Sequence, residues 1–129
     1  MSKQEVLDAM LFQVKRHKKT AADLYNDGHY DFCLFVWHLI IEKLLKAIVV
    51  AKEKDYLFSH KLSNLATHAG ITLTDVQVAE LQEITTFNIE SRYDNIKSAF
   101  YQKATQEYTD NWVKICKQYY ELFMHHVKA

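Results

Sequence analysis

Apolar residues recur every three or four positions along most of the chain, a spacing that places them on one face of an α-helix. The first such segment runs from Lys3 to Asn26. It opens with a capping box, Ser2 followed by Glu5, and ends at Asn26-Asp27-Gly28, where asparagine and glycine favour helix termination. Because the link is short, the next helix is expected to pack antiparallel to the first.

The segment from about His29 to Lys52 is apolar on most of its circumference. Such a helix needs neighbours on several sides, either at the centre of a bundle or at a subunit interface. A narrow stripe of ionisable side chains interrupts the apolar surface. At about 100° per residue, its members project within about 80° of one another: Asp31, His38, Glu42 and Lys46.

Three further helices are predicted in the rest of the chain. A short helix spans Ser59–His68, and a second capping box, from Thr74 to Gln77, opens a helix that ends near Asn88. Residues 89–101 have no clean period and are expected to form an ordered excursion. A last long helix runs from about Lys103 to Val127. The sequence therefore predicts one all-α domain over residues 1–129: an up-and-down antiparallel four-helix bundle with one additional short helix.

Composition agrees with a helical protein and narrows its class. The 129 residues include no proline and only two glycines, too few turn residues for a sandwich or a small barrel. The 16 basic and 16 acidic residues balance, so wrapping of DNA or RNA by extensive phosphate neutralisation is not expected. No segment predicts a membrane span, and Cys33 and Cys116 lie in apolar surroundings outside any CxxC pattern. These features predict a soluble cytoplasmic protein with buried, reduced thiols.

Few residues have a spacing that indicates metal or nucleophilic chemistry. His125 and His126 are adjacent and point about 100° apart, so they do not predict a zinc site, and no metal or cofactor is expected. No serine lies in a glycine-rich elbow, and no glycine-rich loop could cradle a phosphate. The basic run from Lys15 to Lys19 spans a whole helical circumference, which is typical of a solvated surface.

Two interpretations of the ionisable stripe stay open. Glu42 and Lys46 have the order and spacing of an intrahelical ion pair, with His38 one turn earlier. Alternatively, these three residues line a groove that His60 or Arg92 joins. Such a set could bind an anion or a nucleotide phosphate.

Four segments, in this order, resemble the HEPN domain. The run from Tyr30 to Phe35, followed by HLIIEKLLK from His38 to Lys46, is similar to the central helix of that family. Ser59–Leu62 resembles its H-x-L segment, and Asn88–Asp94 resembles its Y-x-x-x-RYP-D segment. The resemblance covers about residues 6–123. It implies a helical bundle that dimerises, is commonly encoded beside a minimal nucleotidyltransferase as a toxin–antitoxin-like pair, and is linked to nucleotide or RNA binding.

The chain departs from the family where catalysis is concerned. Many members are metal-independent ribonucleases that use an R-x4–6-H motif at the dimer cleft. Here Arg92 has no histidine after it until His125, and Arg16 is followed by His17 and then by none before His29. The ribonuclease chemistry therefore lacks an arginine that holds phosphate beside a histidine that moves the proton. Two further departures are His38, where glutamine is common in the family, and Asp94, where proline is common.

The first hypothesis is a non-catalytic HEPN-type homodimer that binds a nucleotide-like ligand or a nucleotidyltransferase partner. In it Lys46 and Arg92 contact phosphate, Glu42 orients Lys46, and Tyr93 stacks on a base. The ligand-binding residues that this hypothesis names are Asp31, His38, Glu42, Lys46, His60, Glu90, Arg92 and Tyr93. The alternative is a divergent ribonuclease that uses His38 or His60. A third hypothesis is a structural partner whose stripe consists only of intrahelical ion pairs.

Overall fold

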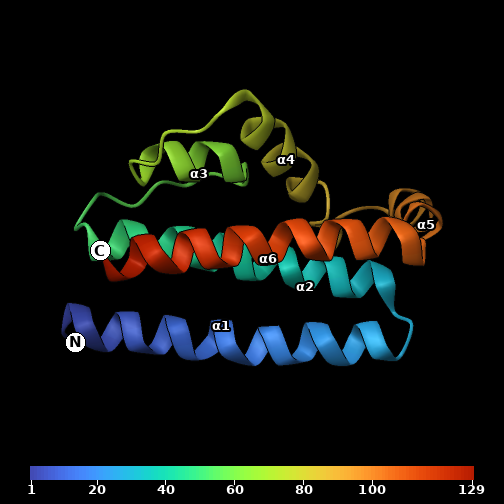
Figure 1. Ribbon diagram of the computed structural model, residues 1–129, viewed down its shortest axis with the longest axis horizontal. Coiled ribbons are helices and arrows are strands. Elements are labelled where there is room, and N and C mark those ends of the chain that lie inside the picture. Colours follow the sequence, from blue (N-terminus) through green and yellow to red (C-terminus); the bar gives the residue numbers. More distant parts are fainter.

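Figure 1 shows a computed structural model of residues 1–129, built from six α-helices. In chain order these are α1 (Lys3–Asn26), α2 (Tyr30–Ala51), α3 (Leu62–His68), α4 (Asp75–Thr85), α5 (Asp94–Lys103) and α6 (Gln106–Lys128). The long helices α1 and α6 each pack along α2 and make few direct contacts with each other. Both chain termini lie at the same end of the bundle (Figure 1).

The short helices α3 and α4 complete the bundle. They pack on each other and on α2, on the side of α2 away from α1 (Figure 1). Together they take the position of a fourth helix, because the chain crosses the length of the molecule through this pair before α6 returns. The all-α bundle predicted from the sequence is thus confirmed.

Local hydrogen bonds explain where two of the helices begin. The Ser2 hydroxyl accepts a hydrogen bond from the Glu5 N–H at 3.1 Å, and the Glu5 carboxylate accepts one from the Ser2 N–H at 3.4 Å. Thr74 and Gln77 form the same reciprocal pair at the start of α4. Both predicted capping boxes are therefore present. Gly28 lies in the turn between α1 and α2. Its φ of +77° is a conformation that glycine adopts without a Cβ clash.

The prediction for residues 89–101 is wrong for most of its length, because residues 94–103 form α5. This helix buries only one side chain, Phe100, whose ring centroid lies 5.6 Å from that of Phe87. A helix with one buried residue leaves no periodic apolar stripe in the sequence. The neighbouring boundaries move accordingly: α4 ends at Thr85, and α6 begins at Gln106 behind the cap Thr105.

One hydrophobic core of 26 buried residues draws side chains from all six helices. Ten of these 26 residues lie on α2, which makes it the centre of the core, so the prediction of a central second helix is confirmed. The two thiols are free and buried, as predicted, and burial raises the pKa of Cys33 to about 11. None of the helices combines the length and apolar character needed to span a bilayer.

Polar side chains link α6 to α4 through hydrogen bonds and α5 to α4 through an ion pair. The Tyr119 hydroxyl of α6 donates to the Glu80 carboxylate of α4 at 2.7 Å. Tyr108 donates in the same way to Glu83, which also pairs with Lys103 of α5 at 2.8 Å. Burial and the neighbouring carboxylates raise the pKa of both tyrosines above its ordinary value. Both phenols therefore stay protonated and remain donors at neutral pH.

Candidate functional site

The exposed part of α2 is confined to one face. Between positions 31 and 50, all residues that are not fully buried fall within an arc of about 120° around the helix axis. They are Asp31, Phe32, Phe35, Leu39, Glu42, Lys43, Lys46 and Val50. We call this surface the open face of α2. It exists because α1, α6 and the α3–α4 pair cover the rest of the helix.

His38 lies at the edge of the open face and is buried, with 1% of its surface exposed. Neither Nδ1 nor Nε2 of its ring has a hydrogen-bond partner, although buried polar atoms nearly always have one. Burial lowers its pKa from 6.5 to about 4; the Glu42 carboxylate opposes this shift, and the charges of Lys46 and His60 reinforce it. The imidazole is therefore neutral at physiological pH, with one N–H donor and one acceptor nitrogen.

Glu42 and Lys46 form an ion pair beside this imidazole, with 3.5 Å between Oε1 and Nζ. With Leu39, Lys43 and His17 of α1 they line a notch of about 150 Å³. Burial lowers the pKa of His17, and the charges of Lys43 and Arg16 lower it further. The notch thus has two lysines and one carboxylate. It is large enough for an anionic group but smaller than the 300–1,000 Å³ or so of an ordinary ligand pocket.

The segment between α2 and α3 brings His60 to the same place. We call residues 54–61 the strap. His68 of α3 holds it through a hydrogen bond between Nε2 and the Asp55 carbonyl. The His60 ring lies 5.5 Å, centroid to centroid, from the exposed Phe58 ring, and its charge acts on the pKa of His38. The structure therefore brings together four of the predicted residues: His38, Glu42, Lys46 and His60.

The other four predicted residues make no contact with this cluster. Asp31 lies in the first turn of α2, about 10 Å along the axis from His38, where its carboxylate accepts a hydrogen bond from the Phe32 N–H at 3.0 Å. Glu90, Arg92 and Tyr93 are exposed in the loop that leads into α5. Their side chains form no ion pair or hydrogen bond. This loop enters α5 at the end of the bundle where α1 turns into α2 (Figure 1).

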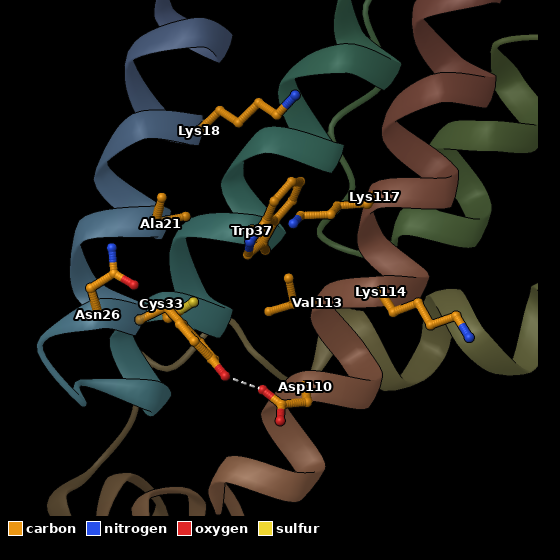
Figure 2. A pocket seen from close by; sticks show the side chains of 11 residues that line it. Lys18, Ala21, Asn26, Cys33, Trp37, Asp110, Val113, Lys114 and Lys117 are labelled. Carbon is orange, nitrogen blue, oxygen red and sulfur yellow. Dashed lines mark hydrogen bonds between the residues drawn. The ribbon is translucent and has the colours of Figure 1, made fainter.

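A second feature, which no sequence pattern predicts, is a hollow of about 550 Å³ between α1 and α6. Figure 2 shows α1 and α6 as its walls and α2, with Cys33 and Trp37, as its floor. One wall includes Lys18, a member of the basic run from Lys15 to Lys19 whose pattern is typical of a solvated surface, and Lys117 lines the other wall. Nearly one hundred residues separate these lysines in the chain, so no local spacing signals their convergence.

The lysines that line the notch and the hollow give both sites the chemistry of anion binding. No three histidine, cysteine or carboxylate side chains converge in a way that could hold a metal ion. His38 carries no proton that it could give up as an acid near neutral pH, because its pKa is about 4. Lysines and a neutral imidazole N–H are, by contrast, suitable donors to a phosphate group.

Comparison with known families identifies the class of this protein. The family model of the HEPN domain matches residues 8–127. This match covers nearly the whole chain, so the protein belongs to the HEPN domain family. No curated protein and no solved structure gives a significant match.

Proposed function

We propose that this protein is a non-catalytic HEPN module that binds a nucleotide through its phosphates and partners a minimal nucleotidyltransferase in a toxin–antitoxin-like pair. The observation that carries the binding site is the buried His38 ring, whose nitrogens have no partner, beside the Glu42–Lys46 notch. An unpartnered buried polar group is costly unless a water molecule or ligand satisfies it. A phosphate seated in the notch would provide a partner for Nδ1 of His17, which lines the notch and is also buried without one, and it would lie beside His38.

Each residue of the notch has a separate task in this proposal. The ammonium groups of Lys46 and Lys43 contact phosphate oxygens, and Glu42 holds Lys46 in place. His38 lies beside the notch, outside its lining, and adds no charge there because its ring is neutral. The notch admits one phosphate, so the nucleoside lies outside it, and this proposal retains Arg92 and Tyr93, which do not line the notch, as the residues that meet the nucleoside.

Isothermal titration calorimetry with ATP tests this proposal. We expect binding heat for the wild-type protein and at least about tenfold weaker binding for Lys46→Ala, because each charge-assisted hydrogen bond contributes roughly 1.5–3 kcal/mol. Lys19→Ala is a matched control, since Lys19 also forms an i,i+4 ion pair, with Asp23, but lies outside the notch. Arg92→Ala tests the contribution of the loop. No binding heat, or equal affinities for Lys46→Ala and Lys19→Ala, would contradict the proposed site.

We further propose a homodimer formed through the open face of α2. Three apolar side chains on it project within about 60° of one another: Phe32, Phe35 and Leu39. Phe32 is 48% exposed. An exposed row of apolar side chains on a helix that is otherwise buried is typical of a subunit interface. A second copy on this face would place two notches near one seam. The free thiols Cys33 and Cys116 are consistent with a proposed cytoplasmic location, where thiols stay reduced.

The second candidate function is a divergent ribonuclease, and one observation favours it: His60 is exposed close to Lys46 and His38. His60 could transfer a proton, whereas His38 is buried and neutral. Incubation of the pure protein with a mixed RNA pool separates the two functions. Under our proposal the RNA stays intact. Cleavage that disappears in His60→Ala would establish the ribonuclease instead.

A further inference from the structure

The hollow between α1 and α6 has the size and lining of a binding site for a small molecule. Its volume of about 550 Å³ falls within the range of roughly 300–1,000 Å³ typical of ligand pockets. It lies on the other side of α2 from the notch, because Trp37 on its floor projects about 180° from Lys46. A ligand in the hollow therefore does not contact the notch.

One end of the hollow is cationic. In Figure 2, Lys117 extends from α6 toward Trp37, Lys18 extends from α1 across α2 above Trp37, and Lys114 points away from the hollow. Neither Lys18 nor Lys117 pairs with a carboxylate: the three ion pairs of the structure use Lys19, Lys46 and Lys103. The Lys18 ammonium lies 4.1 Å from the centroid of the Tyr120 ring instead. Two unpaired ammonium groups that converge on one hollow favour an anion between them.

The opposite end of the hollow repels an anion and offers hydrogen bonds. Tyr25 donates its hydroxyl proton to the Asp110 carboxylate there (Figure 2). Apolar surface from Ala21 and Val113 lies between the two ends. A ligand that is complementary to this lining has an anionic group at the lysine end and a flat apolar ring that packs against the walls.

We propose that this hollow is a second ligand site, which binds a small organic phosphate. The phosphate group lies between Lys18 and Lys117, and a flat ring joined to it packs over Ala21 and Val113. Mononucleotides and other ring-bearing phosphomonoesters share this chemistry. The proposal does not depend on the notch.

Tryptophan fluorescence provides a direct test, because Trp37 and Trp112 are the only tryptophans in the chain. The variant Trp112→Phe leaves Trp37 as the single reporter in the floor of the hollow. We expect AMP and phenyl phosphate to change its emission saturably, with adenosine and inorganic phosphate binding at least about tenfold more weakly. Lys18→Ala and Lys117→Ala should each weaken the binding of AMP reported by Trp37 by about tenfold or more, whereas Lys19→Ala, whose ammonium group pairs with Asp23 outside the hollow, leaves it unchanged. Calorimetry on the chain with both tryptophans gives a second measurement, and circular dichroism checks the fold of each variant.

The remaining outcomes of these binding measurements either overturn or support the proposed second site. No saturable response to either ring phosphate in both measurements overturns the proposal, as does equal affinity for AMP and adenosine. It is also overturned if AMP binding survives both lysine substitutions. AMP binding that only Lys46→Ala weakens assigns the nucleotide to the notch, which refutes this second site and supports the proposed function. A response to AMP but not to phenyl phosphate supports the site and identifies its ligand as a nucleotide.

Discussion

Among single residues, His38 is one of the two buried polar side chains of the protein. Its ring is buried, its two nitrogens lack partners, and its pKa of about 4 keeps it neutral. Leaving a buried polar group without a partner costs about 1–3 kcal/mol. A residue that destabilises the fold in this way is a reasonable candidate for a binding role, because a ligand that supplies the missing partner recovers part of that free energy.

His38 should make the folded state sensitive to acid. The unfolded chain binds a proton on this ring below pH 6.5, but the folded chain does so only near pH 4. The unfolded state thus holds more protons in this window, so the free energy of unfolding falls as the pH drops through it, by up to about 3 kcal/mol. Urea unfolding at about pH 7 and about pH 5 should show a smaller loss for His38→Gln than for the wild type, because glutamine does not titrate.

Exposed His125 gives a matched control for this acid effect, since His125→Gln should lose as much stability as the wild type. The charged groups that act on His38, namely Glu42, Lys46 and His60, remain in all three proteins. An identical loss of stability in the wild type and His38→Gln would show that His38 is already protonated or exposed in the folded state.

The spacing of residues predicted only part of the site. It placed Asp31, Glu42 and Lys46 on one face because helical geometry is fixed, and the structure puts all three on the open face. It did not predict that His38 would be buried, since that depends on segments that approach α2 from elsewhere in the chain. The convergence of Lys18 with Lys117 likewise depends on how two helices pack against a third.

Among the helices, the best predicted are those with an explicit start signal or a long apolar stripe. The capping boxes at Ser2 and Thr74 located the first residues of α1 and α4. In contrast, α5 was missed because tertiary contacts of Phe100, rather than a periodic pattern, hold it in place. Helical spacing places Tyr119 on the buried stripe of the last helix, but it does not indicate that the Tyr119 hydroxyl meets Glu80 of α4.

The link between α4 and α6 yields a prediction at this scale. Tyr119→Phe removes the hydroxyl that donates to Glu80 at 2.7 Å and leaves a half-buried carboxylate without its donor. We expect the free energy of unfolding to fall by about 1–2 kcal/mol, as measured by urea denaturation. The next residue supplies the control: the Tyr120 hydroxyl makes no hydrogen bond, so Tyr120→Phe should cost less. Equal losses in the two variants would mean that the Tyr119 hydrogen bond does not stabilise the packing of α4.

For the whole molecule, the distribution of charge matters more than its sum. The 16 basic and 16 acidic side chains cancel, so no long-range field attracts anions to the protein. The notch and the hollow are instead local features that lie on opposite sides of α2. Binding at either should therefore depend on individual lysines rather than on overall charge.

The proposed dimer is also a property of the whole molecule. Size-exclusion chromatography with light scattering should give twice the chain mass for the wild type. Phe32→Glu places a charge on the open face, and because Phe32 is already 48% exposed, the substitution should separate the subunits without unfolding them. Phe12→Glu, at an exposed phenylalanine of α1, should remain dimeric. A monomeric wild type, or a dimer that survives Phe32→Glu, would contradict the proposed interface.

The most direct test of the account is to follow the imidazole signals of His38 and His60 by nuclear magnetic resonance while ATP is added near pH 7. We predict that both signals shift along one saturation curve, that His38 stays neutral throughout, and that the exposed His125 is unaffected. The account would be contradicted if saturating ATP left His38 and His60 unchanged, or if His38 were charged at this pH.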